Sequence, residues 1–324
     1  MGPCTVFCIL LLPVLWILYA LYPALRTKWA SVQNLNEKYA CQWVMVTGAA
    51  GGIGQSICDD LARQGLNVLA VGRNQEKLDE LCSRLQTSHR ILAEPVIADF
   101  SQTDNYTSPP YIEALESACA GKDVGILVLN AGLAQVGSVL APNARALAAI
   151  AQINAVSQVY VVEWFMRRLV AHGRVTSAVV SISSVAAFTP TPLASTYSAS
   201  KAFVSRFMDG VRPEATAAGI DLLTVHPGPV RTPFYDCLDD QTAKRGMWLV
   251  NMWATGPEAV SQAILRSVGR VNNIPQGFVG VWGELAMRVV GTGTVAWIMD
   301  RVGLGLIARK ERALYVDKFA KRAD

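Results

Sequence analysis

The strongest constraint on the fold is a regular alternation of short apolar runs with longer amphipathic segments. Runs that are apolar on both faces, separated by helices, are typical of a parallel sheet covered on both sides. Seven such runs over about 240 residues favour a single doubly wound α/β domain with a parallel seven-stranded sheet. The expected strands are residues 43–46, 67–72, 94–99, 125–130, 177–183, 221–226 and 277–282, and the expected helices are residues 54–66, 74–86, 111–119, 147–173, 197–219 and 255–269.

An uncharged apolar stretch precedes this domain. Residues 5–25 carry no charged side chain and are followed by Arg26 and Lys28. A membrane-spanning helix needs about 20 mostly apolar residues. A cleaved signal peptide is the alternative, but it would have basic residues before its apolar core. The basic flank favours a cytosolic domain, so we expect residues 1–25 to form an N-terminal transmembrane helix, single-pass and uncleaved, with residues 26–41 as its linker.

Charge and composition exclude several other classes of protein. The formal net charge of +4 over 324 residues is small and scattered, so no nucleic-acid partner is expected. The seven cysteines form no CxxC pair and are odd in number, which indicates reduced thiols in a cytosolic protein. The three histidines form no helical pair with another ligand type, so no metal site is expected.

A glycine-rich turn follows the first expected strand. Residues 47–54 read TGAAGGIG and place Gly48, Gly52 and Gly54 immediately before a helix. Positions without side chains let the backbone approach a pyrophosphate, and the N–H groups at a helix start favour its negative charge. Glycines also mark ordinary turns, but this position is typical of a Rossmann-type nucleotide site.

The end of the second expected strand bears on which nucleotide binds. Many NAD-binding folds carry an acid there for the ribose 2′-hydroxyl. This chain has Gly72 and then Arg73, with no carboxylate before Glu76. Arg73 is either an ordinary surface arginine or the partner of a 2′-phosphate, and the missing acid favours NADP(H).

Four stretches in order make the chain resemble the short-chain dehydrogenase/reductase family. They are TGAAGGIG at residues 47–54, LNAG at 129–132, YSASK at 197–201 thirteen residues after Ser184, and HPGPVRT at 226–232. The resemblance covers roughly residues 42–282, the whole expected domain. One departure is Leu129, where the family often has a first asparagine that tethers the central strand.

The resemblance implies roles for particular residues. Tyr197 would be the general acid/base with Lys201 as its partner, Ser184 would bind the substrate carbonyl, and Asn154 would complete the catalytic set by holding a water near the lysine. The implied cofactor contacts, with Arg73 added from its position, are Gly48, Gly52, Ile53, Gly54, Arg73, Asp99, Asn130, Tyr197, Lys201, Pro227, Gly228, Val230 and Thr232.

The Tyr197–Lys201 pair also makes chemical sense without the resemblance. Reduction of a ketone requires a proton donor that works near neutral pH, whereas free tyrosine has a pKa near 10. Residues four apart share one helix face, so Lys201 can place a positive charge near the Tyr197 oxygen and favour tyrosinate. Taken alone, Tyr197 fits a packing residue as well as an acid.

Two further segments are apolar. Residues 233–260 follow the last motif, where this fold commonly has a lid over the substrate, and include Trp248 and Trp253. Those side chains suit an apolar guest or pack the lid onto the domain. Residues 283–324 are apolar but interrupted by charges, which predicts an amphipathic helical extension that lies on a membrane, closes the substrate mouth, or packs on the domain or a second subunit.

The combined prediction is a membrane-anchored NADPH-dependent reductase of a lipid ketone, with its domain at residues 42–282 on the cytosolic face of the endoplasmic reticulum. Fatty-acyl, sphingoid and steroid ketones are the substrate classes, by resemblance to hydroxysteroid dehydrogenases and 3-oxoacyl-CoA reductases. One alternative is NAD(P)+-dependent oxidation of a hydroxysteroid or retinol. Another is a non-catalytic nucleotide-binding membrane scaffold, against which the intact Asn, Ser, Tyr and Lys set argues. The family resemblance also admits a homodimer.

Overall fold

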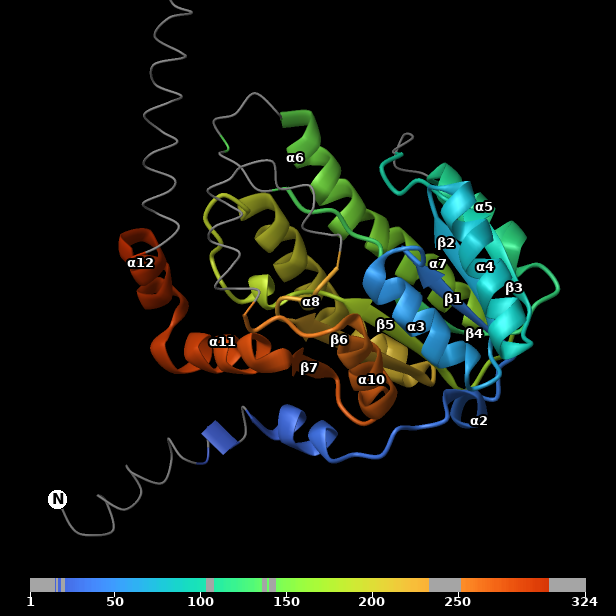
Figure 1. The fold of residues 1–324 in the computed structure, drawn as a ribbon, viewed down its shortest axis with the longest axis horizontal. Coiled ribbons are helices and arrows are strands. Elements are labelled where there is room, and N and C mark those ends of the chain that lie inside the picture. The colour runs from blue at the N-terminus through green and yellow to red at the C-terminus, as the bar shows by residue number, and fades with distance from the viewer. Residues whose placement is uncertain are drawn as a thin grey trace, which may run out of the picture.

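The computed structural model describes residues 15, 17–18, 21–102, 108–135, 139, 144–232 and 252–302 (Figure 1). In this part of the chain, seven strands form one parallel sheet in the order β3-β2-β1-β4-β5-β6-β7. The sheet starts in the middle and grows outward in both directions, which is the doubly wound arrangement predicted from the alternation. The strands are β1 (Trp43–Thr47), β2 (Asn67–Gly72), β3 (Ala93–Ile97), β4 (Val124–Leu129), β5 (Ser177–Ile182), β6 (Ile220–Pro227) and β7 (Asn273–Gln276).

Helices cover both faces of this sheet (Figure 1). One core cluster joins the sheet to α3, α4 and α10, and a second joins its other face to α5, α7 and α8. The helices are α2 (Leu35–Tyr39), α3 (Gly52–Ala62), α4 (Gln75–His89), α5 (Pro110–Cys119), α6 (Ala144–Ala151), the π-helical turn η1 (Gln152–Val156), α7 (Ser157–Ala171), the 3-10 turn η2 (Val185–Ala187), α8 (Ser195–Ala217), α10 (Pro257–Ser267), α11 (Gly277–Val290) and α12 (Thr292–Val302).

The central strands are buried on both sides, and neighbouring residues belong to different core clusters. In β4, Ile126 and Val128 lie in the cluster with α3, whereas Leu127 and Leu129 lie in the cluster with α7 and α8. Side chains alternate across a strand, so a continuous apolar run fills two helix-to-sheet layers at once. This explains why the runs in the sequence are apolar throughout.

The prediction for the seventh strand was wrong in position. Residues 277–282 begin α11, and the strand that pairs with β6 is Asn273–Gln276. Gly277, with φ +78°, turns the chain between them. A short apolar run does not distinguish a strand from a helix by periodicity alone. Large apolar residues four positions apart, such as Phe278 and Trp282, fit the helix that is observed.

Within the described chain, one continuous helical run is apolar and long enough by composition to cross a membrane. This run, Ala144–Ala171, joins α6, η1 and α7, and 44% of its most apolar window is buried inside the domain. Phe165 and Leu169 pack in the core cluster on the sheet, so we assign it to the domain core. The transmembrane helix expected at residues 5–25 lies largely outside the described residues.

The expected linker is packed on the domain for much of its length. A short helix at residues 21–28 leads into it. The backbone N–H and side chain of Gln33 both donate to the carbonyl oxygen of Leu265, at 3.2 and 3.0 Å. The Tyr39 hydroxyl donates to Asp221 at 2.8 Å, and Arg174 donates to the Tyr39 carbonyl oxygen at 2.6 Å. The segment before the first strand is therefore tied to three separate parts of the domain.

Candidate active site

The turn between β1 and α3 brings bare backbone to the end of the sheet. Gly48 has φ +62°, and a Cβ there would lie 2.9 Å from the Cα atom of Ala131. A Cβ on Gly54 would overlap the Gly48 carbonyl oxygen. Because α3 begins at Gly52 without a side-chain cap, its first N–H groups are free to bind an anion.

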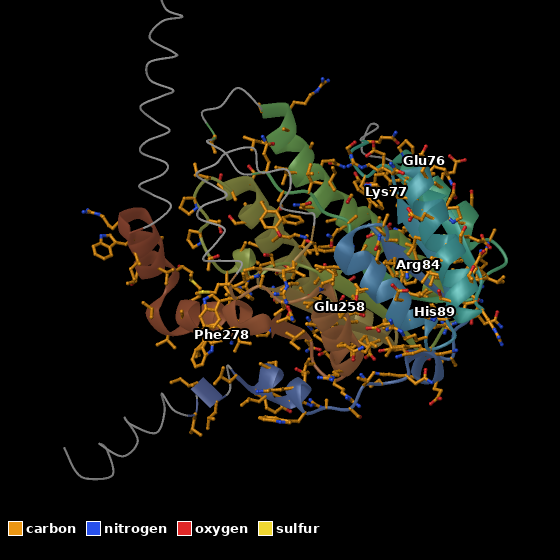
Figure 2. The ribbon with its side chains drawn as sticks, viewed as in Figure 1. Glu76, Lys77, Arg84, His89, Glu258 and Phe278 are labelled. Carbon is orange, nitrogen blue, oxygen red and sulfur yellow. The ribbon has the colours of Figure 1, made fainter. Side chains whose placement is uncertain are left out.

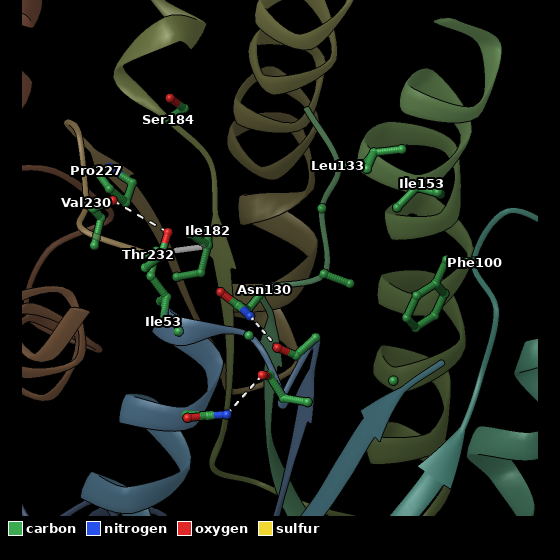
Figure 3. A pocket seen from close by; sticks show the side chains of 18 of the residues that line it. Ile53, Phe100, Asn130, Leu133, Ile153, Ile182, Ser184, Pro227, Val230 and Thr232 are labelled. Atoms are coloured by element: carbon green, nitrogen blue, oxygen red, sulfur yellow. Dashed lines mark hydrogen bonds between the residues drawn. The ribbon is translucent and has the colours of Figure 1, made fainter. Parts of the chain in front are cut away.

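A cavity of about 470 Å³ lies at the carboxyl ends of the strands and includes this turn (Figure 3). Open α/β sheets place their ligands at this edge. Every predicted cofactor residue except Gly54 lines the cavity, as do three of the four predicted catalytic residues. Those lining it are Gly48, Gly52, Ile53, Arg73, Asp99, Asn130, Ser184, Tyr197, Lys201, Pro227, Gly228, Val230 and Thr232.

Two cationic side chains line the cavity beyond β2. Arg73 follows the strand directly and is exposed, and Lys77 lies four residues later in the first turn of α4. The side chain of Asn74 caps this helix by accepting from the Lys77 backbone N–H at 2.9 Å. Sequence reasoning missed Lys77 as a second cation beside Arg73. The sequence signal for Lys77 is its position: it lies four residues after Arg73, in the first turn of the helix that Asn74 caps.

The next wall of the cavity comes from the loop after β3. Asp99 lines it, and one of its carboxylate oxygens accepts from the backbone N–H of Ser101 at 3.0 Å and from the Ser101 hydroxyl at 2.8 Å. These bonds fix the Asp99 carboxylate at the rim while its other oxygen stays available to a ligand. The arrangement fits the predicted contact to an adenine.

The glycine turn is tied to the central strand by Thr47 and Asn130. The Thr47 hydroxyl accepts from the backbone N–H groups of Asn130 and Ala131, both at 3.0 Å. The Asn130 side-chain nitrogen donates to the carbonyl oxygens of Thr47 at 3.2 Å and Gly48 at 3.0 Å. These bonds couple β1 to β4 although Leu129 replaces the family's tethering asparagine. Sequence reasoning missed Thr47, whose hydroxyl looks like an ordinary strand residue.

The segment after β6 closes the opposite side of the cavity. Gly228 donates its N–H to the Gln276 carbonyl oxygen at 2.9 Å, and Val230 forms a bridge with Thr255. The Thr232 side chain lies against Gly52, where an added Cβ would be 3.0 Å from the Thr232 Cβ. The phosphate turn and this segment therefore meet across the cavity mouth.

Lys201 lies in a buried position one turn into α8. Its side-chain nitrogen donates to the Ile182 carbonyl oxygen at 2.8 Å and lies 5.9 Å from the centre of the Tyr197 ring. The residue is 4% exposed. Burial removes the ammonium from water and lowers the Lys201 pKa from 10.5 to about 8. Lys201 therefore places its amino group beside the Tyr197 ring.

Asn154 lies behind the cavity wall in the π-helical turn. Its oxygen accepts from the Leu133 backbone N–H at 2.7 Å, and its nitrogen donates to the Leu133 carbonyl oxygen at 2.8 Å and to the Ser200 hydroxyl at 3.1 Å. The asparagine therefore joins the β4 loop to α8 through bonds to residues distant in the sequence. π-helical turns inside α-helices are frequently found at functional sites.

Gly132 separates Asn154 from Lys201. A Cβ on this glycine would lie 3.4 Å from the Asn154 side-chain oxygen and 3.5 Å from the Lys201 nitrogen. The Asn154 oxygen and the Lys201 nitrogen therefore both border the space next to the Gly132 Cα atom. The position fits the water that the family resemblance places near the lysine, because a buried water needs at least two polar partners.

Ser184 and Tyr197 reach the cavity from neighbouring elements. Ser184 is the extended residue before η2, and its hydroxyl oxygen accepts from the Ala186 N–H at 3.2 Å. That bond leaves its hydroxyl hydrogen to donate to a carbonyl. α8 starts at Ser195, so Tyr197 lies in its first turn and Lys201 in its second. The site thus combines the Tyr197 phenol, the Lys201 ammonium and the Ser184 hydroxyl next to the glycine turn.

Comparison with known proteins gives consistent results. A family model described as short chain dehydrogenase matches residues 42–243. A very-long-chain 3-oxoacyl-CoA reductase-A of Danio rerio is 31% identical over 195 residues, which are 59% of this chain and 59% of that protein. A 7beta-hydroxysteroid dehydrogenase of Collinsella aerofaciens is 30% identical over 200 residues, 62% of this chain and 73% of that protein.

Solved structures agree with the fold. A 7beta-hydroxysteroid dehydrogenase studied for stereoselectivity superposes with a TM-score of 0.71 at 26% identity, over 82% of this chain and 99% of its own. A short-chain dehydrogenase from Sphingobium yanoikuyae in complex with NADPH has a TM-score of 0.62 at 26% identity, over 78% of this chain and 95% of its own. The shared core therefore extends well past the residues matched by sequence.

Proposed function

Because this chain belongs to the short-chain dehydrogenase/reductase family, we propose that it transfers a hydride between NADPH and the carbonyl of a hydrophobic lipid substrate. The observation that carries the proposal is the buried Lys201 beside Tyr197, one helical turn apart on the wall of the cavity that holds the glycine turn. An anion-binding turn and a proton donor in one cavity are what a nicotinamide-dependent reduction requires.

In this proposal, the chain's own residues move the proton and orient the carbonyl. A nicotinamide held by the glycine turn and the segment after β6 would supply the hydride to the carbonyl carbon. Tyr197 donates its phenolic proton to the carbonyl oxygen, so that ketone and hydride become an alcohol. Lys201 stabilises the resulting tyrosinate, and Ser184 donates its hydroxyl to the same carbonyl oxygen. Asn154 positions the β4 loop and α8 around the lysine.

The residues around the cavity fit NADP(H). The glycine turn brings backbone N–H groups to the start of α3, where a pyrophosphate would bind, and Cβ atoms at Gly48 or Gly54 would prevent this tight turn by meeting Ala131 and the Gly48 carbonyl oxygen. Arg73 and Lys77 supply two cations where a ribose 2′-phosphate would extend, next to the carboxylate-free end of β2. The NADPH complex of the Sphingobium yanoikuyae relative supports the same cofactor.

The substrate class rests on the relatives and on the sequence. The names of the Danio rerio and Collinsella relatives point to 3-oxoacyl-CoA and steroid substrates, in which the ketone lies on a long acyl chain or on a steroid ring system, and both of these parts are apolar. The uncharged stretch at residues 5–25 supports a single-pass anchor, with the domain on the cytosolic face of the endoplasmic reticulum. An anchored enzyme meets substrates that partition into lipid.

A turnover assay tests the reaction. Full-length protein in detergent micelles, given NADPH and a panel of 3-oxoacyl-CoA and steroid ketones, should oxidise NADPH with at least one ketone. Tyr197→Phe removes the proton donor and should lower kcat by about 100-fold or more. Tyr22→Phe, at an exposed tyrosine outside the cavity, is the matched control and should keep full activity. Turnover by no ketone, or equal turnover by the Tyr197 variant and the wild type, would refute the proposal.

A binding assay tests the cofactor. Arg73→Ala and Lys77→Ala should each weaken NADPH binding by about 10-fold or more, because a charge-assisted bond to a phosphate contributes about 1.5–3 kcal/mol. NADH lacks the 2′-phosphate, so its dissociation constant should change little. The two constants are measured by quenching of protein fluorescence. Equal losses for NADPH and NADH would remove both side chains from the phosphate site.

A second candidate is the opposite direction, oxidation of a hydroxysteroid with NADP+. The resemblance to 7beta-hydroxysteroid dehydrogenases, in sequence and in structure, favours it. The same groups serve both directions, with tyrosinate accepting the proton from the alcohol. The two directions are distinguished by steady-state rates measured with a steroid ketone and NADPH and with the corresponding hydroxysteroid and NADP+.

A further inference from the structure

A group of exposed aromatic side chains lies on α11 and next to it. Phe278 and Trp282 lie one helical turn apart and are 51% and 52% exposed. Trp253 stacks on Phe278 with ring centroids 4.5 Å apart, and the Phe278 and Trp282 centroids are 6.1 Å apart. Figure 2 shows Phe278 on α11. We call Trp253, Phe278 and Trp282 the aromatic stripe.

The aromatic stripe is not needed to hold α11 on the domain. The opposite side of the helix makes that contact through Gly280, Gly283 and Met287. A Cβ on Gly280 would lie 3.1 Å from the His226 carbonyl oxygen, and one on Gly283 would lie 3.0 Å from a Val185 methyl. Small residues thus let α11 approach the domain closely, while its largest side chains face outward. Exposed apolar area in one patch is typical of an interaction surface.

The exposed apolar surface continues beyond the stripe into α12. Val289 is 54% exposed at the end of α11, and Trp297 is 59% exposed on α12. The Arg301 guanidinium lies 5.8 Å from the centre of the Trp297 ring. Tryptophan with an adjacent long cation is typical of helices that lie in a membrane interface, where rings sit at headgroup depth and cations reach anionic lipids.

The short helix at residues 21–28 has the same chemistry. Arg26 lies 5.8 Å from the centre of the Tyr22 ring, and Lys28 lies 5.4 Å from that of Trp29, which is 74% exposed. Residues 21–36 contain two cations and no Asp or Glu. This helix includes the end of the uncharged stretch at residues 5–25, so its cations lie at the polar boundary of a membrane-length apolar segment.

Both elements leave the domain at the β7 edge of the sheet. The linker is held there by the Arg270 guanidinium, which donates to the Ser31 carbonyl oxygen at 2.7 Å, and by Gln33, which donates to the Val268 carbonyl oxygen at 3.1 Å. Residues 268–270 lie just before β7, and α11 lies just after it (Figure 1). In Figure 1, residues 21–28 and α11 extend toward the same side of the domain, which is the side that a lipid surface at residues 21–28 would face.

We propose that the aromatic stripe docks on the lipid bilayer surface, as a second membrane contact besides the N-terminal apolar segment. The occupant is the headgroup layer of an anionic bilayer. Docking there places lipid beside the cavity, since the inner side of α11 packs on Gly228 and on Val185, the residue after Ser184. The inference concerns a surface and does not require the proposed reductase activity.

The test measures lipid contact at one position of the full chain. Trp282→Cys is labelled with a nitrobenzoxadiazole fluorophore and reconstituted into vesicles of phosphatidylcholine and phosphatidylserine, with and without brominated phosphatidylcholine as a quencher. Val175→Cys, 79% exposed in the turn between α7 and β5, is the control. The labelled parent chain corrects for its own thiols. Label at position 282 should lose at least half of its emission to the brominated lipid, while label at position 175 should lose no more than the blank.

Two outcomes would overturn the proposal. Equal quenching at positions 282 and 175 would show that the stripe lies away from lipid. Shielding of position 282 from iodide in water without quenching by brominated lipid would assign the stripe to another protein surface, such as a second copy. Phe278→Cys repeats the measurement if the Trp282 variant does not fold. Neither readout needs turnover, so a failed ketone assay would leave this result unaffected.

Discussion

The buried ammonium of Lys201 should leave a measurable signature in the pH dependence of stability. The perturbation is Lys201→Met, which keeps an unbranched apolar side chain and removes the charge. In the folded chain, the Lys201 pKa falls from 10.5 to about 8 because the side chain is removed from water. Between these two values the unfolded chain binds more protons than the folded chain. The free-energy cost of burying Lys201 therefore falls, and the unfolding free energy rises, as pH rises.

The magnitude follows from the size of the pKa shift. Each pH unit between the two pKa values adds about 1.4 kcal/mol to the unfolding free energy. Relative to Lys201→Met, the wild type should therefore gain about 1.4 kcal/mol between pH 7 and pH 9. Burial also raises the pKa values of four thiols in the described chain, which gives the opposite slope above pH 9. Those thiols are common to both proteins and cancel in the difference.

The assay is urea unfolding of the cofactor-free full chain in non-ionic detergent with a reductant, followed by tryptophan fluorescence at pH 7, 8 and 9. Lys77→Met removes a solvent-exposed ammonium from the same cavity and serves as the matched control. A difference between wild type and Lys201→Met that stays constant with pH, or shrinks as pH rises, would refute the argument that burial depresses this lysine.

Two further predictions concern stability. Gly54→Ala should lower the unfolding free energy by about 1–3 kcal/mol, because its Cβ overlaps the Gly48 carbonyl oxygen. Gly210→Ala, at an exposed helical position with open space around the new Cβ, should raise it by about 0.5–1 kcal/mol. Urea unfolding measures both variants, and changes in unfolding free energy of the same sign would contradict the close contact between Gly54 and the Gly48 carbonyl oxygen. Tyr39→Phe should lower the melting temperature by removing the 2.8 Å bond to Asp221, a loss of about 1–2 kcal/mol; an unchanged melting temperature would show that this bond is not stabilising.

The sheet and the outline of the site were predictable because both depend on local chemistry. Continuous apolar runs between amphipathic segments give strands buried on both faces, and glycines after the first strand give a turn free of side chains. The catalytic pair was predictable because residues four apart share a helix face, which places Tyr197 and Lys201 together in α8.

The parts that were missed depend on contacts between distant residues. Residues 277–282 read as a strand, but Gly277 turns the chain and the following side chains match one helix face. The role of Thr47 arises because β4 ends beside it, and the residues next to Thr47 in the sequence do not indicate that contact. The two-ended bonding of Asn154 to Leu133 and Ser200 likewise requires the folded chain. Tertiary contacts of this kind are invisible to periodicity.

The linker before the first strand sets how freely the domain can move. A flexible chain of 16 residues would let its ends separate by about 22 Å on average and change direction at will. Here Gln33 is bonded to α10, and Tyr39 is held by Asp221 and Arg174. Little slack remains between residue 29 and the sheet. Any surface that holds residues 21–28 therefore also fixes the height and the tilt of the cavity above it, because the linker is a rigid connection.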